Sequence, residues 1–287
     1  MTRDGGPGAG GIDPQRLWLA STQPRRGRRP AHSREAITAA AVALADAEGL
    51  EAVTMRRVAS QVGVSVMSLY SYAPDKGTLL ELMVDHVSGE LRTGTERRTG
   101  GEPLTDGEPP ADAELPTDGE PPTDTERPSN SAPLTVPAPT GDWRADLKAI
   151  GHLQRALMLR HPWLPAALST RRAPGPHTLA FLEHALAVLR PTGLDGAAKL
   201  EIFAQLTSFV AAHVGHELAQ AATARSPDRL AAEARYLAAV AADGHHPELA
   251  EALAAPGRSL TPEATFTRFL NRLTGGLDSA AEHPEQS

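Results

Sequence analysis

The chain has 287 residues, no cysteine, a net charge of -7 and an isoelectric point near 5.9. The absence of cysteine excludes disulfide bonds, thiolate metal sites and cysteine nucleophiles. No run of about 18 apolar residues and no apolar core of a signal peptide occurs, so we expect a cytoplasmic protein without a membrane partner. The length suits two folded parts.

Residues 1–32 are expected to form a disordered arm, because they are rich in glycine and proline and have no sustained period. The arm ends in four arginines, Arg25, Arg26, Arg28 and Arg29. This basic cluster has two possible roles: it enters a minor groove of DNA, or it is a solvated tail.

Residues 33–98 are predicted to form a helix-turn-helix DNA-binding domain of three helices, followed by a connecting helix. Ser33 caps the first helix and Gly49 stops it, whereas Thr54, Ser65 and Asp75 cap the next three. Apolar residues recur at helical spacing inside each segment. The connecting helix is expected to run from 75 to 98.

The turn between the second and third helices carries a second, independent signal. Two helices that cross at about 90–120° need a small residue at the crossing and a residue with positive φ in the turn. Ala59 and Gly63 meet these needs, and Val58, Val62 and Leu69 provide apolar packing positions.

Residues 99–141 are expected to be an acidic, proline-rich, low-complexity insertion. The segment 99–142 holds ten acidic residues, ten prolines and a single basic residue, Arg127. The sequence Thr-Asp-Gly-Glu-Pro-Pro occurs at 105–110 and again at 117–122. Such a composition cannot bury a core, and without this segment the rest of the chain carries a charge of about +2, because -7 minus -9 is +2.

Residues 142–278 are predicted to be helical throughout and to form a ligand-binding and dimerisation domain, with a disordered tail at 279–287. No stretch alternates for long in the way a strand does. The fold class is therefore all-α. The expected helices are 143–160, 162–168, 176–190, 196–223, 227–242, 247–254 and 262–277.

The segment 54–87 resembles the tetracycline-repressor (TetR) family. The resemblance is carried by the turn Gly63-Val64-Ser65, the pair Leu69-Tyr70, and Lys76 at the start of the connecting helix. It implies a sequence-specific DNA-binding transcriptional regulator.

The same resemblance implies which residues touch DNA. Val66, Met67 and Ser68 would face base edges in the major groove. Arg56 would either read a guanine or hold a phosphate, and Arg57 would hold a phosphate. The remaining implied phosphate contacts are Thr54, Ser65, Tyr70, Tyr72 and Lys76, of which Thr54 and Ser65 are also helix caps.

The second domain is similar to the effector domain of tetracycline repressor itself. The similarity lies in Trp143, the segments 159–163 and 169–171, Gly175-Pro176 and the last apolar pattern. It implies an Ω-shaped homodimer built through helices 196–223 and 262–277. The implied effector-pocket residues are Thr170, Arg171, Phe181, Phe209, His213, His216 and Glu217. Ala167 stands where tetracycline repressor has a magnesium-binding histidine, which argues against a tetracycline-magnesium effector.

Other classes of function fit the sequence less well than regulation of transcription. His213 and His216 lie three apart next to Glu217, but no second group of ligands accompanies them, so we expect neither a metal nor a cofactor. No cluster of nucleophile, base and oxyanion donors suggests an enzyme. A helical sensor without DNA function remains an alternative.

The sequence thus predicts a ligand-released repressor that binds a palindromic double-stranded operator as a dimer. A small molecule would shift the connecting helix and change the separation of the two recognition helices. The sequence does not distinguish an activator from a repressor, and it names neither the effector nor the operator.

Overall fold

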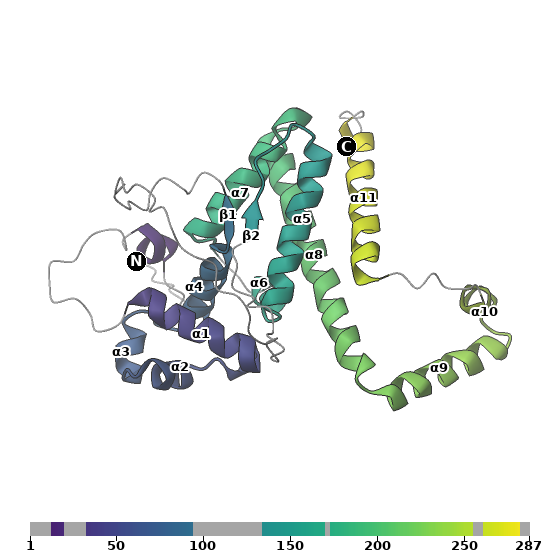
Figure 1. Cartoon of the computed structure of the whole chain (residues 1–287), viewed down its shortest axis with the longest axis horizontal. Coiled ribbons are helices and arrows are strands. Elements are labelled where there is room, and N and C mark those ends of the chain that lie inside the picture. The colour runs from purple at the N-terminus through teal and green to yellow at the C-terminus, as the bar shows by residue number, and fades with distance from the viewer. Residues whose placement is uncertain (1–12, 20–32, 94–133, 170–172, 255–260, 282–287) are drawn as a thin grey trace, which may run out of the picture.

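The structure is a computed structural model, and it describes residues 13–19, 33–93, 134–169, 173–254 and 261–281. Within these ranges almost every element is a helix, so the predicted all-α class is confirmed. Figure 1 shows a group of short helices next to a bundle of longer ones, with two further helices that project away from the bundle.

The first group is the predicted helix-turn-helix unit. It consists of α1 (Arg34–Glu48), a 3-10 turn (Leu50–Ala52), α2 (Met55–Val62), α3 (Val66–Tyr70) and α4 (Lys76–Ser88). Side-chain oxygens of Ser33, Thr54, Ser65 and Asp75 each accept a backbone N–H in the first turn of a helix. Local capping chemistry therefore placed all four helix starts correctly.

Two glycines make the predicted sharp helix ends. Gly63 has φ 79° and ψ 30°, the left-handed conformation, and its N–H and that of Val64 both return to the carbonyl of Ala59. Gly49 also has a positive φ of 84°, although its ψ of 168° lies outside the left-handed helical region. Any side chain would be strained at either position.

The prediction that the whole arm 1–32 is disordered was wrong for residues 13–19. Gln15–Leu19 form a short π-helical turn, η1, in which Leu17 is fully buried. Arg34 fixes this turn by donating from Nη1 to the carbonyl of Leu17 at 3.1 Å. The apolar side chains of Leu17 and Trp18 pack on the core and hold this short segment against it. The arginine cluster lies outside the described residues.

The connecting helix is shorter than predicted, since α4 ends at Ser88 and not near 98. The chain then forms a strand, β1 (Leu91–Thr93), which pairs in parallel with β2 (Leu134–Val136), Leu91 opposite Leu134. The insertion was predicted to extend to 141, but Val136 is buried in the core. The pairing places residues 91–93 beside residues 134–136, and the segment 94–133 between them lies outside the described residues.

The second group is a bundle of α5 (Trp143–Arg160), α6 (Leu164–Leu168), α7 (Pro176–Val188) and the first half of α8 (Gly196–Ala224). A 3-10 turn, Arg190–Thr192, joins α7 to α8. Leu147, Ile150, Leu206 and Val210 are among its fully buried side chains. The first four of the seven helices predicted for residues 142–278 are thus present.

The second half of α8 leaves the bundle and leads to α9 (Pro227–Ala242) and α10 (Pro247–Ala254), which project from it (Figure 1). Neither of these helices has a buried residue. The last helix, α11 (Pro262–Ala281), returns to the bundle and buries Phe266 and Leu270 beside α5 and α8. No helix in the described ranges is both long and apolar enough to cross a membrane.

Candidate DNA interface and effector cavity

The outer surface of α3 presents two of the three predicted base-reading residues. Met67 is 80% exposed and Ser68 is also exposed, whereas Val66 is half-buried and packs on the core. Ser65 accepts from the N–H of Ser68 at 3.0 Å, and the two hydroxyls lie 2.8 Å apart. The exposed part of this helix offers a thioether and hydroxyls. These groups suit apolar contact with thymine methyl groups better than they suit hydrogen bonds that distinguish one base from another.

The two predicted arginines of α2 differ in their surroundings. Arg56 is exposed, and its guanidinium forms no hydrogen bond or ion pair with another described residue. Arg57 forms two hydrogen bonds with Glu48 of α1, at 2.9 and 2.5 Å. This pair lowers the pKa of Glu48 and raises that of Arg57. A phosphate would therefore compete with Glu48 for Arg57, and Arg56 is the freer of the two cations.

The predicted phosphate contacts surround the same surface. Tyr70 is 43% exposed at the end of α3, Lys76 is exposed at the start of α4, and Tyr72 is half-buried between them. The ammonium group of Lys76 lies 3.4 Å from the carbonyl of Leu50. Thr54 and Ser65 cap α2 and α3, whose N-terminal N–H groups favour anions. The structure thus gathers the predicted DNA-binding residues of α2, α3 and α4 around one helix-turn-helix unit.

A cavity of about 810 Å³ lies inside the bundle, between α5, α6, α7 and α8. Its wall is mostly apolar and includes Leu157, Met158, Phe181 and Phe203. None of the described lining side chains is charged. The size and character match those of sites that bind drug-sized molecules.

The cavity uses a different face of α8 from the predicted one. Phe181 lines it, but Phe209, His213, His216 and Glu217 do not appear in its wall. Phe209 stacks on Phe269 of α11 with ring centroids 3.4 Å apart, and Glu217 pairs with Arg155 at 2.8 Å. Thr170 and Arg171 lie outside the described residues.

The two histidines of α8 also have structural surroundings. His213 lies against the ring of Phe266, with centroids 5.0 Å apart, and burial lowers its pKa. His216 bonds to Gln220 one turn later. Within the described ranges, no group of three or more histidine or acidic side chains is arranged so that it could hold a metal ion.

The polar side chains of the cavity connect it to α4. Thr178 of α7 donates to Asp85 and lies within hydrogen-bond distance of the Ser88 hydroxyl, at 3.2 Å in both cases. Asp85 is buried and also accepts the N–H of Thr178 and faces Nδ1 of His177, both at 3.0 Å. A carboxylate of α4 thus binds the N-terminus of α7, where the helix dipole favours negative charge. A molecule in the cavity would touch the C-terminal end of α4, the helix that follows the helix-turn-helix unit.

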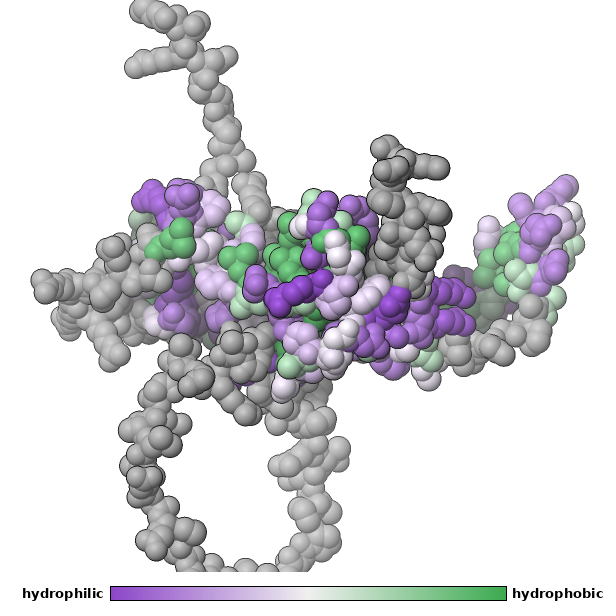
Figure 2. All heavy atoms as spheres, turned by 90° about the horizontal axis from the view of Figure 1, so that it is seen from above, coloured by the Kyte–Doolittle hydropathy of each residue, from purple (hydrophilic) through white to green (hydrophobic). Residues whose placement is uncertain are grey.

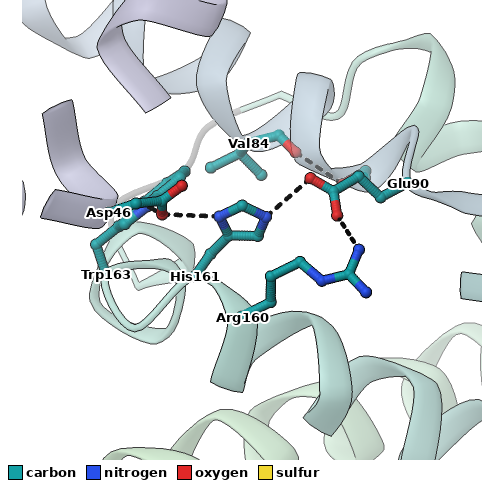
Figure 3. Close-up of polar contacts among 7 residues, drawn as sticks. Asp46, Val84, Glu90, Arg160, His161 and Trp163 are labelled. Atoms are coloured by element: carbon teal, nitrogen blue, oxygen red, sulfur yellow. Dashed lines mark hydrogen bonds and ion pairs between the residues drawn. The ribbon is translucent and has the colours of Figure 1, made fainter. Parts of the chain in front are cut away.

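A second connection joins the bundle to α1 (Figure 3). His161, at the end of α5, lies with Nδ1 2.8 Å from Asp46 of α1 and Nε2 2.9 Å from Glu90 after α4. Trp163 also donates to Asp46, at 2.7 Å, and Arg160 donates to Glu90, at 2.6 Å. This set of five residues is called the His161 cluster below.

The charges of the His161 cluster reinforce one another. Burial lowers the pKa of His161, but the hydrogen bonds to Asp46 and Glu90 outweigh it and raise the pKa to about 9. Burial raises the pKa of Glu90, whereas His161 and Arg160 bring it below its usual value. His161 is therefore a charged imidazolium at neutral pH, and it links α1 and the end of α4 to the bundle. Sequence reasoning missed this cluster, because its only sequence signal was the motif at 159–163.

The fold defines a helix-turn-helix DNA-binding protein whose second, helical domain contains a cavity beside the end of the connecting helix. The sequence profile described as "Bacterial regulatory proteins, tetR family" matches residues 37–83. The profile described as "Tetracyclin repressor-like, C-terminal domain" matches residues 136–280. The chain belongs to the TetR family of bacterial regulatory proteins, as the sequence resemblance predicted.

Individual relatives agree with this assignment. The HTH-type transcriptional repressor DrrR1 of Streptomyces coeruleorubidus is 32% identical over 206 residues, which are 71% of this chain and 60% of DrrR1. This match therefore spans less than two thirds of the length of DrrR1. An HTH-type transcriptional regulator of Saccharopolyspora erythraea is 28% identical over 280 residues, 98% of this chain and 95% of that protein. The structure of ActR from Streptomyces coelicolor with actinorhodin has a TM-score of 0.62 and 24% identity, and covers 88% of this chain and 100% of that one.

Proposed function

We propose that the protein is a homodimeric transcriptional repressor that binds a palindromic operator and is released from it by a small molecule. The observation that carries this proposal is the position of α4. Its N-terminal half packs in the helix-turn-helix unit through Leu79 and Met83, and Ser88 at its end lines the cavity. A ligand that displaces Ser88 moves α4, and with it the recognition helix. The proposal needs no metal and no cofactor.

The names of the relatives support both halves of the proposal. DrrR1 is described as a repressor, and ActR was solved with the small molecule actinorhodin. For this chain the effector is a molecule that binds more tightly in the state that cannot hold the operator, since only a difference in affinity shifts an equilibrium.

Removal of two predicted phosphate contacts should abolish tight operator binding. We expect Tyr70→Ala with Lys76→Ala to weaken binding to the DNA flanking the gene by roughly 10- to 100-fold, and to reduce the salt dependence by about two ions per dimer. The measurement is fluorescence anisotropy with labelled DNA at several salt concentrations. Arg190→Ala is the control, because this exposed cation lies at the end of α7, in the other domain.

If the wild-type protein shows no salt-dependent binding to flanking DNA, selection of bound fragments from the whole genome is the next measurement. Failure there as well would refute DNA binding and leave the sensor function. Equal binding by the double variant would instead show that α3 does not face the DNA.

Dimerisation would cover the apolar surface of the projecting helices. Tyr236 of α9 is 67% exposed, and Leu230, Leu249 and Leu253 are also exposed on α9 and α10. Figure 2 shows hydrophobic surface on this projecting part. Helices with no buried residue are not stable by themselves in water, so we place the second subunit against them, next to a bundle of α8 and α11 from both chains.

We expect the protein to sediment as a dimer, and Tyr236→Glu to raise the dimer dissociation constant at least tenfold, which is about 1.4 kcal/mol. Analytical ultracentrifugation over a range of concentrations measures this constant. Tyr236→Phe keeps the apolar ring and serves as the control. An unchanged constant for Tyr236→Glu would exclude α9 from the interface.

A further inference from the structure

The polar groups in the wall of the cavity are poorly suited to hold an anion. The described ones are hydroxyls and one amide, and no described side chain of the wall carries a charge. Ser88 and Ser169 each donate the hydroxyl proton to a backbone carbonyl of the preceding turn, at 2.8 and 2.7 Å. Thr178 donates to Asp85 at 3.2 Å. The protons of these three hydroxyls are therefore already engaged, and an anion would meet their lone pairs.

A buried carboxylate lies directly behind this wall. Asp85 is 5% exposed, and its Oδ1 accepts both the hydroxyl and the N–H of Thr178. The start of α7 would otherwise attract an anion, but Asp85 already occupies it. His177 faces the other oxygen at 3.0 Å, and its side chain is 51% exposed, so water screens its charge.

The carboxylate acts on whatever touches the α4 end of the cavity. A ligand group that contacts the Thr178 hydroxyl lies about 6 Å from Asp85, the sum of two hydrogen-bond lengths. Negative charge at that distance is repelled, and loss of water on entry disfavours it further. Neutral aromatic groups meet a suitable surface, because the rings of Phe181 and Phe203 lie edge to face in the wall, with centroids 6.1 Å apart.

We propose that the cavity takes its effector in the uncharged form: a largely apolar, drug-sized molecule binds, and its anion is rejected. The inference rests on the proposed role of the cavity as the effector site. For an effector that carries an acidic hydroxyl or carboxyl group, the neutral form is the one that releases the operator.

A coloured phenol tests this selection directly. The probe is 7-hydroxy-4-trifluoromethylcoumarin, which ionises near neutral pH and whose neutral and anionic forms absorb at different wavelengths. At one neutral pH, where the protein keeps a constant charge, binding to the full chain should raise the ratio of neutral to anionic probe at least about tenfold. Absorption spectra measure this ratio at saturating protein. The 7-methoxy analogue has no ionisable group, and equilibrium dialysis of it measures the affinity for the rings alone.

Three variants assign the selection to the cavity. Ala204 lines the cavity at an exposed position of α8, so Ala204→Lys adds a cation to the wall and should shift bound probe toward the anion by about tenfold relative to wild type. Gln205→Lys is the matched control, because Gln205 is exposed one residue later and bonds to Glu201 outside the wall. Asp85→Asn keeps the shape and removes the charge, and should weaken the preference for the neutral form about threefold or more.

The outcomes separate the two proposals. If neither coumarin binds the wild-type protein, the cavity is not an effector site and the proposed function fails there. If the methoxy analogue binds but the bound phenol keeps or increases its anionic fraction, the cavity stands and selection for the uncharged form is refuted. Equal shifts for Ala204→Lys and Gln205→Lys refute it too, because the selection would then arise outside the cavity. An unchanged shift in Asp85→Asn refutes the role of the buried carboxylate.

Discussion

Replacement of His161 by leucine is expected to lower the free energy of unfolding by roughly 2–4 kcal/mol at neutral pH. The imidazolium is buried and bonded on both sides, and its removal leaves Asp46 and Glu90 without their shared cation. Each carboxylate keeps one partner, Trp163 or Arg160, so the loss is smaller than for a fully isolated charge. Chemical denaturation followed by circular dichroism measures it.

The same residue gives a pH dependence with a definite sign. The pKa of His161 is about 9 in the folded protein and near 6.5 for the unfolded chain. A raised folded pKa means that the stabilisation is complete below pH 6.5 and is lost as the pH rises through about 9. The wild-type protein should therefore lose about 3 kcal/mol of this contribution across that range.

His161→Gln separates the charge from the hydrogen bonds, because glutamine is neutral throughout the titration. We expect this variant to lack the loss of stability between pH 6.5 and 9, whereas His245→Gln, at an exposed position, should keep it. An identical pH profile for His161→Gln and wild type would show that the imidazolium does not stabilise the interface.

The parts of the fold that were predictable from sequence are those set by local chemistry. Ser33, Thr54, Ser65 and Asp75 cap helices through atoms three residues away, so their spacing alone places the helix starts. Gly63 is required by the left-handed turn in which it lies. Most of the predicted DNA-binding surface follows directly from these elements.

Contacts between distant segments were not predictable in this way. His161 bonds to Asp46 across 115 positions and to Glu90 across 71, and nothing in the local sequence of any of the three indicates the others. The strands β1 and β2 have three residues each, too few to alternate recognisably, and pair across the segment 94–133.

The predicted effector-pocket residues show a third limit of prediction from sequence. The helix α8 carries apolar and polar side chains around much of its surface, and periodicity does not say which face meets the cavity and which meets another helix. Phe203 and Thr207 line the cavity, whereas Phe209 and His213 face α11. Only the packing of α11 against α8 decides between the two faces.

Substitution of Gly175 by alanine, like replacement of His161, should cause a large loss in the free energy of unfolding. A Cβ atom at this position would lie 2.3 Å from Cγ of Asp85 and 2.7 Å from the indole of Trp18. Both distances are far below van der Waals contact, so the N-terminus of α7 would have to move away from α4. The buried carboxylate of Asp85 would then lose its bonds to Thr178 and His177. We expect a loss of about 3 kcal/mol or more in the free energy of unfolding.

Gly196→Ala is the matched control, since no atom lies within 4 Å of its Cβ position and alanine favours a helix. The clash itself can be isolated by a double-mutant cycle with Asp85→Ala. Removal of the carboxylate relieves most of the overlap, so Asp85→Ala should cost much less in the Gly175→Ala background than in wild type. Additive costs would mean that Gly175 and Asp85 do not hold α4 against α7, and the route from cavity to recognition helix would then have to run through the His161 cluster alone.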